Sequence, residues 1–89
     1  MKESAVAEHL RHRTEAAGGE VRKVVWAGRK HAPDYRVMIP GRSVWVETKS
    51  PTGTANDGQL REHARMRRLG ETVLVLCTIG EVDRWFDGA

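Results

Sequence analysis

A stretch of alternating residues around one Pro-Gly pair constrains the fold of this chain more than any other feature. Residues 34–39 and 43–49 each alternate apolar and polar side chains, and Pro40-Gly41 lies between them. Side chains alternate between the two faces of a strand, and Pro-Gly is typical of a tight turn. The stretch therefore predicts a β-hairpin with one apolar face and one polar face.

Counting outward from the turn predicts which residues face each other. If Pro40 and Gly41 are the two turn residues, position 39 pairs with 42 and Asp34 lies directly across from Glu47. Side chains opposed in this way have Cβ atoms about 5 Å apart. A loop with an odd number of residues, or a bulge, would shift the pairing.

Two opposed carboxylates repel each other unless a cation, a proton or a basic group lies between them. A divalent metal is one solution, and such hard oxygen ligands suit Mg²⁺ or Mn²⁺. Lys49 shares the face of Glu47 and points to the same place. The alternative is a cross-strand salt bridge, in which Lys49 or Arg36 neutralises the acids on a solvated surface.

The rest of the chain predicts helices and strands around this hairpin. A helix begins at Ser4 and stops at Gly18-Gly19, and Asn56 caps a second helix. Apolar, β-branched runs predict two further strands. The expected order is helix 4–17, strand 21–26, the hairpin, helix 56–69, strand 73–78 and a short helical turn at 81–86. This order fits an α/β fold, a mixed sheet flanked by helices.

Size and charge restrict the class of protein. With 89 residues, 39% hydrophobic and 30% charged, we expect a single domain over residues 1–89. The only cysteine, Cys77, lies in an apolar run and is expected to be a buried, inert thiol. We expect a cytoplasmic protein without a membrane anchor, because no stretch is apolar enough to span a bilayer.

The hairpin carries a motif that resembles a nuclease superfamily. Pro33-Asp34 and, thirteen residues on, Glu47-Thr48-Lys49 match the PD-(D/E)xK pattern of restriction-endonuclease-like proteins. The surrounding segments make the resemblance more specific. Residues 28–34, 58–63 and 65–70 are similar to the stand-alone phage members of the virus-type replication-repair nuclease family, VRR-Nuc. The likeness extends from residue 3 to about residue 83.

The resemblance implies a restriction-endonuclease-like fold and a magnesium-dependent phosphodiesterase. Asp34 and Glu47 would hold Mg²⁺ or Mn²⁺, with the backbone carbonyl of Thr48 as a third ligand. Lys49 would orient or activate the attacking water, and Gln59 would contact the water, the metal shell or a phosphate. The chemistry would be in-line displacement at phosphorus with the metal as Lewis acid.

Two positions of the resemblance leave alternatives open. Asn56 and Gln59 have the spacing of a capping box, so Gln59 could serve the helix, the site or both. Family members carry a glutamate on the first helix where this chain has Ala7. Glu8 is the preferred substitute and Glu3 another, or the third carboxylate is missing and the activity is weak or lost.

The resemblance also implies a homodimer that cuts branched DNA, such as a four-way junction. Basic residues in three clusters suit a polyanion, although arginines on helix surfaces are often merely solvated. The expected phosphate contacts are Arg29, Lys30, Arg61, Arg65 and Arg68. Two other classes remain open, a non-catalytic DNA-binding protein that keeps the nuclease fold and a basic protein-interaction module.

Overall fold

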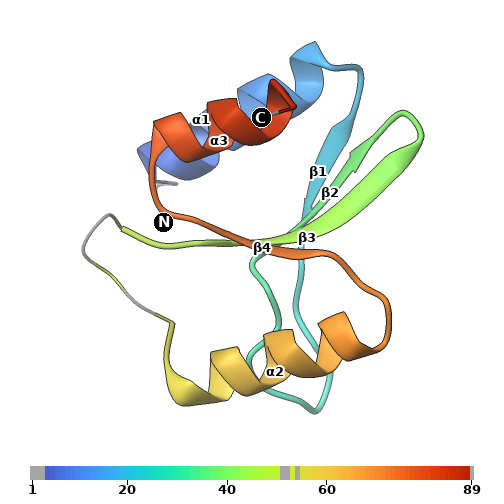
Figure 1. Cartoon of the computed structure of the whole chain (residues 1–89), viewed down its shortest axis with the longest axis vertical. Coiled ribbons are helices and arrows are strands. Elements are labelled where there is room, and N and C mark those ends of the chain that lie inside the picture. The colour runs from blue at the N-terminus through green and yellow to red at the C-terminus, as the bar shows by residue number, and fades with distance from the viewer. Residues whose placement is uncertain (1–3, 51–52, 54, 89) are drawn as a thin grey trace.

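The computed structural model describes residues 4–50, 53 and 55–88. Its elements are, in chain order, α1 (Ala5–Ala16), β1 (Glu20–Lys23), β2 (Tyr35–Ile39), β3 (Arg42–Thr48), α2 (Asp57–Arg68), β4 (Val73–Leu76) and α3 (Ile79–Phe86). Figure 1 shows α1 and α3 on one side of the strands and α2 on the other. The predicted α/β order is confirmed. Within the described part of the chain, no helix is long and apolar enough to cross a membrane.

The sheet is mixed, as its connections require. Its strand order is β1-β2-β3-β4, in which β2 is antiparallel to both β1 and β3, and β4 is parallel to β3. Parallel neighbours need a long crossover connection, and α2 supplies it. Helix α2 lies on the other side of the sheet from α1 and α3 (Figure 1), and Glu47 on β3 contacts Gln59 and His63 of this helix.

The β2–β3 hairpin has the register that the sequence count predicts. Ile39 pairs with Arg42, and the ladder runs to Tyr35 opposite Val46. Gly41 has a φ of +77°, a left-handed conformation that glycine adopts without a steric penalty in a tight turn. Continuing this register by one residue beyond the ladder would put Asp34 opposite Glu47, as the sequence count expects.

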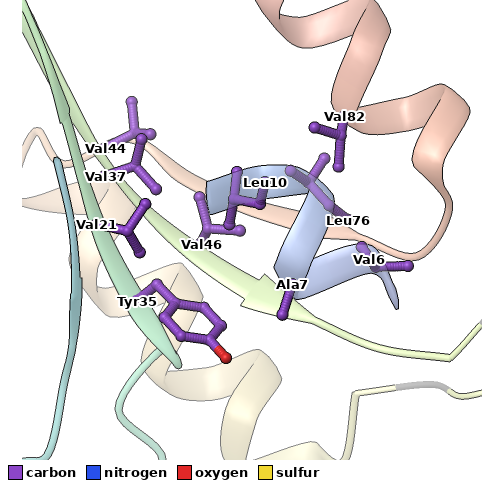
Figure 2. Packing of buried hydrophobic residues seen from close by; sticks show 10 residues of the cluster. All are labelled: Val6, Ala7, Leu10, Val21, Tyr35, Val37, Val44, Val46, Leu76 and Val82. Atoms are coloured by element: carbon purple, nitrogen blue, oxygen red, sulfur yellow. The ribbon is translucent and has the colours of Figure 1, made fainter. Parts of the chain in front are cut away.

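The hydrophobic core lies between the sheet and the helices α1 and α3. Figure 2 shows side chains of all four strands and both helices meeting there. Leu10 on α1, Val37 on β2 and Val46 on β3 are fully buried. The core cluster consists of Val6, Ala7, Leu10, Val21, Tyr35, Val37, Val44, Val46, Leu76 and Val82. The apolar face of the hairpin therefore stabilises the fold and leaves the other face for chemistry.

The first strand, the last strand and the last helix differ from the sequence prediction, and β4 ends at Leu76 instead of residue 78. The first strand ends at Lys23 and not at residue 26, and beyond it the ring of Trp26 packs against Trp45, with ring centroids 5.4 Å apart. The last helix is longer than the predicted turn. Thr78 and Glu81 form a capping box that starts α3 at Ile79.

Candidate active site

Asp34 immediately precedes β2 and is fixed by the end of β3. Its Oδ2 accepts a hydrogen bond from the backbone N–H of Thr48 at 3.0 Å and another from the Thr48 hydroxyl at 3.1 Å. Pro33, which is fully buried, anchors the chain just before the acid. Thr48 thus positions Asp34 through its amide and hydroxyl, a role that the sequence reasoning did not foresee. The expected role of its carbonyl remains a prediction.

Glu47 is a buried carboxylate on the face of β3 that α2 covers. Only 2% of the residue is exposed. Its Oε2 lies 3.5 Å from Lys49 Nζ and accepts a hydrogen bond from Gln59 Nε2 at 3.4 Å. Its Oε1 faces His63, with Nε2 at 3.8 Å. The two oxygens of Glu47 therefore have different neighbours.

The electrostatics of Glu47 reflect a crowded acidic pair. Burial, then the negative charge of Asp34 and a hydrogen bond with its carboxyl group, raise the pKa of Glu47 to about 7, and Lys49 opposes this shift. Asp34 and Glu47 are therefore close enough to interact directly, as the register predicts.

Lys49 reaches the carboxylates from one side of the site. Its side chain is 22% exposed, so the ammonium contacts Glu47 while remaining accessible. It also lines a largely apolar pocket whose other walls come from residues 4–6, 48, 50 and 77–79. A substrate phosphate could therefore approach Lys49 from solvent.

Gln59 caps its helix and also contacts the carboxylate of Glu47, while its expected role toward water, metal or phosphate stays a prediction. Its Oε1 accepts from the backbone N–H of Asn56 at 3.1 Å, and its own N–H donates to Asn56 Oδ1 at 2.8 Å, which is a capping box. Its Nε2 donates to Glu47. Because the amide has a separate donor and acceptor, starting the helix and contacting the carboxylate do not compete.

His63 is a residue of this site to which the sequence reasoning assigned no role. It follows Gln59 by four residues, so both side chains lie on the same face of α2. That spacing was the available signal. The ring is 1% exposed, and burial lowers its pKa, with the positive charges of Arg67 and Lys49 acting in the same direction.

The donor set fits a hard divalent cation of the Mg²⁺ or Mn²⁺ type. Asp34 and Glu47 are two interacting carboxylates whose mutual repulsion such an ion would remove. Among the described residues, no group of three or more His, Cys, Asp and Glu side chains is arranged to hold a metal. The structure does not bring Glu8 into the site, since Glu8 is exposed on α1 while Ala7 is buried in the core. Glu3 lies outside the described residues.

The predicted phosphate contacts divide into two kinds. Arg29 donates to the buried Glu62 at 2.7 Å, and Arg65 donates to the same oxygen at 3.1 Å. The Arg29 hydrogen bond, then that of Arg65, lower the pKa of Glu62 despite its burial. Both arginine side chains are about half exposed, so Glu62 orients them without burying them. The remaining three, which lie exposed on the surface, are Lys30, Arg61 and Arg68.

The tryptophans beside the site have structural partners. Trp26 Nε1 donates to Glu62 and Trp45 Nε1 donates to Glu71, while the two rings contact each other. Arg36 stacks over the Trp45 ring at 4.4 Å. These contacts favour a packing role over the alternative of stacking on an exposed base.

Comparisons with known proteins place this geometry in a family. No protein-family model matches the chain. The chain is 39% identical over 77 residues to "Putative nuclease p44" of Acyrthosiphon pisum secondary endosymbiont phage 1, covering 85% of this chain and 83% of that protein. It also matches a solved structure described as a VRR_NUC domain with a TM-score of 0.87 and 38% identity, over 92% of this chain and 90% of the other. The chain therefore belongs to the VRR-Nuc family of nucleases.

Proposed function

We propose that this protein is a Mg²⁺- or Mn²⁺-dependent DNA endonuclease that hydrolyses phosphodiester bonds. The observation that carries the proposal is the interacting pair Asp34 and Glu47 with Lys49 Nζ 3.5 Å from Glu47. Two carboxylates and an ammonium meet at the end of a rigid hairpin, and the family to which the chain belongs supports the assignment. The backbone carbonyl of Thr48 is the proposed additional ligand.

The side chains divide the work of hydrolysis between them. When bound by Asp34 and Glu47, a divalent cation supplies Lewis-acid polarisation of the phosphate and makes water a better nucleophile. The Lys49 ammonium holds the attacking water and stabilises the charge that develops at phosphorus. Gln59 fixes the carboxylate of Glu47 through its amide. Water oxygen bonds to phosphorus as the P–O bond to the leaving group breaks, which gives a phosphate monoester and a hydroxyl.

The proposed substrate is branched DNA such as a four-way junction, bound by a homodimer. A two-fold dimer offers two equivalent sites to a two-fold substrate. Arg29 and Arg65, which Glu62 orients, would contact DNA phosphates. Further phosphate contacts would come from Lys30, Arg61 and Arg68. A phage protein among the relatives supports action in the cytoplasm of an infected host cell.

Metal binding and cleavage test the proposal together. Calorimetry with Mn²⁺ should show binding to the wild type and none to Asp34→Ala. Asp87→Asn is the matched control, because Asp87 is an exposed acid at the end of α3 that pairs with Arg13. This control should bind Mn²⁺ as the wild type does. Glu47→Ala and Lys49→Ala should abolish cutting while leaving the protein folded, since both side chains lie on the face away from the core.

Cleavage assays separate the nuclease from its rivals. Four-way junction, flap, duplex and single-stranded DNA should be compared with Mg²⁺ and with Mn²⁺. Exposed Glu8 and buried Ala7 are the observations that favour a catalytically silent DNA-binding protein. That protein would bind DNA without cutting any of the four substrates. A protein that binds DNA phosphates must lose DNA affinity as the salt concentration rises. A protein-interaction module would show no such salt-dependent DNA binding.

A further inference from the structure

His63 lies against the carboxylate of Glu47 and away from solvent. Its Nε2 is 3.8 Å from Glu47 Oε1, and the two side chains are 1% and 3% exposed. It stands one turn beyond Gln59 on α2, whose Nε2 contacts the other oxygen of the same carboxylate. Two side chains from one helix thus meet the two oxygens of one buried acid.

The polar atoms at this contact have no hydrogen-bond partner among the described residues. These atoms are Glu47 Oε1 and both ring nitrogens of His63. A buried polar group left unpaired lowers the stability of the fold, so stability alone would favour an apolar side chain at position 63. The histidine therefore has a role that packing does not explain.

A ring N–H is the group through which His63 can donate to Glu47. A neutral imidazole carries one N–H donor and one acceptor nitrogen. Glu47 Oε1, which faces His63, is a hydrogen-bond acceptor. An imidazole hydrogen on Nε2 would therefore point to this oxygen.

We propose that His63 is a positioning residue for Glu47, in which the Nε2–H group holds Oε1 and leaves Oε2 for the reacting centre. The inference rests on the proposed function, because it assigns the orientation of a metal ligand. The separation of 3.8 Å exceeds a hydrogen bond by less than about 1 Å. Hydrogen bonds at catalytic groups are commonly long in the free protein and shorten in the productive complex, so a small rotation of either side chain completes this one.

A pair of substitutions at position 63 tests the role directly. His63→Leu fills the site without a donor, whereas His63→Gln places an amide N–H near the position of Nε2. Groups that orient a metal ligand typically contribute 10- to 100-fold to metal affinity. Calorimetry should therefore show His63→Leu binding Mn²⁺ on the order of 10- to 100-fold more weakly than the wild type, with His63→Gln recovering most of the affinity.

Stability measurements distinguish positioning from packing. His63→Leu should be at least as stable as the wild type in urea without metal, because it removes unpaired polar atoms. Met66→Ala is the control on the same helix, since Met66 is also buried. It should lose stability and keep the wild-type affinity for Mn²⁺. If His63→Leu binds Mn²⁺ as tightly as the wild type, the proposal is overturned while the nuclease assignment stands.

The tautomer of His63 gives a second test that needs no variant. Long-range ¹H–¹⁵N spectra of the Mg²⁺-saturated wild type should show the hydrogen on Nε2. A hydrogen on Nδ1 would overturn the proposal even if His63→Leu failed to fold. Absence of Mn²⁺ binding by the wild type would overturn the proposed function itself, and with it this inference.

Discussion

Replacing Glu47 by glutamine should stabilise the metal-free protein at alkaline pH while removing its chemistry. Glu47 is buried beside Asp34, and its charged form is disfavoured there. Glutamine has nearly the same shape, and its amide carries no charge to repel Asp34. Its oxygen can still accept from Lys49 or from Gln59.

The size of the effect follows from the pKa of Glu47, which folding raises from 4.5 to about 7. The native state then binds more protons than the unfolded chain between these values. The stabilising contribution is complete below pH 4.5 and is lost as the pH rises through 7. One pKa unit corresponds to about 1.36 kcal/mol, so the full penalty on the wild type approaches roughly 3 kcal/mol. The advantage of Glu47→Gln should grow by about 2 kcal/mol between pH 5 and pH 8.

Urea unfolding in the presence of a chelator measures this advantage at the two pH values. The control is Glu15→Gln, an exposed acid on α1, which should show no comparable change. For a domain of this size, 2 kcal/mol corresponds to a rise of about 8–16 °C in the unfolding midpoint. Mn²⁺ should restore the stability of the wild type at pH 8 and leave Glu47→Gln unchanged. The electrostatic reasoning would be refuted if Glu47→Gln gained the same stability over the wild type at both pH values, or if it were less stable than the wild type at pH 8.

Three further predictions address DNA contact, the support of Asp34 and the core. Arg65→Ala should weaken DNA binding and reduce the slope of log affinity against log salt concentration by about 0.9, because one phosphate contact is lost. An unchanged slope would show that Arg65 does not contact DNA. Thr48→Val should cost about 1 kcal/mol in urea unfolding and weaken Mn²⁺ binding, because Asp34 loses the hydroxyl donor at 3.1 Å. Leu10→Ala should lower the free energy of unfolding by about 2–5 kcal/mol in the same assay, because the Leu10 side chain is fully buried in the core. A smaller decrease would mean that the core collapses around the cavity.

The hairpin could be derived from sequence because its geometry is local. A two-residue turn fixes the register, and the period of two along a strand then decides which face each side chain takes. The pairing of Ile39 with Arg42, and hence the meeting of Asp34 with Glu47, follows from counting alone. The ends of α1 and α2 were also predictable, because Ser4 and Asn56 cap them through their own side chains.

Contacts between distant segments could not be derived in this way. Glu62 pairs with Arg29 across 33 residues of sequence, and Trp26 reaches Glu62 across 36. Nothing in the local pattern states where α2 lies along the sheet, and this placement decides which helix residues reach Glu47. His63 was therefore visible only as a neighbour of Gln59 on one helix face. The start of α3 was different, because the capping box of Thr78 and Glu81 is a local signal that sequence reasoning passed over.

The two faces of the sheet separate stability from chemistry. The face toward α1 and α3 buries an apolar cluster that depends on no charged group. The face toward α2 is joined largely by polar contacts, among them Gln59 and His63 with Glu47, and Arg67 with the carbonyl of Val73 at 2.6 Å. A substitution at Glu47 therefore leaves the apolar core intact and changes how α2 is held. Because Arg65 lies on that same helix, the helix that contacts Glu47 also carries one of the proposed phosphate contacts.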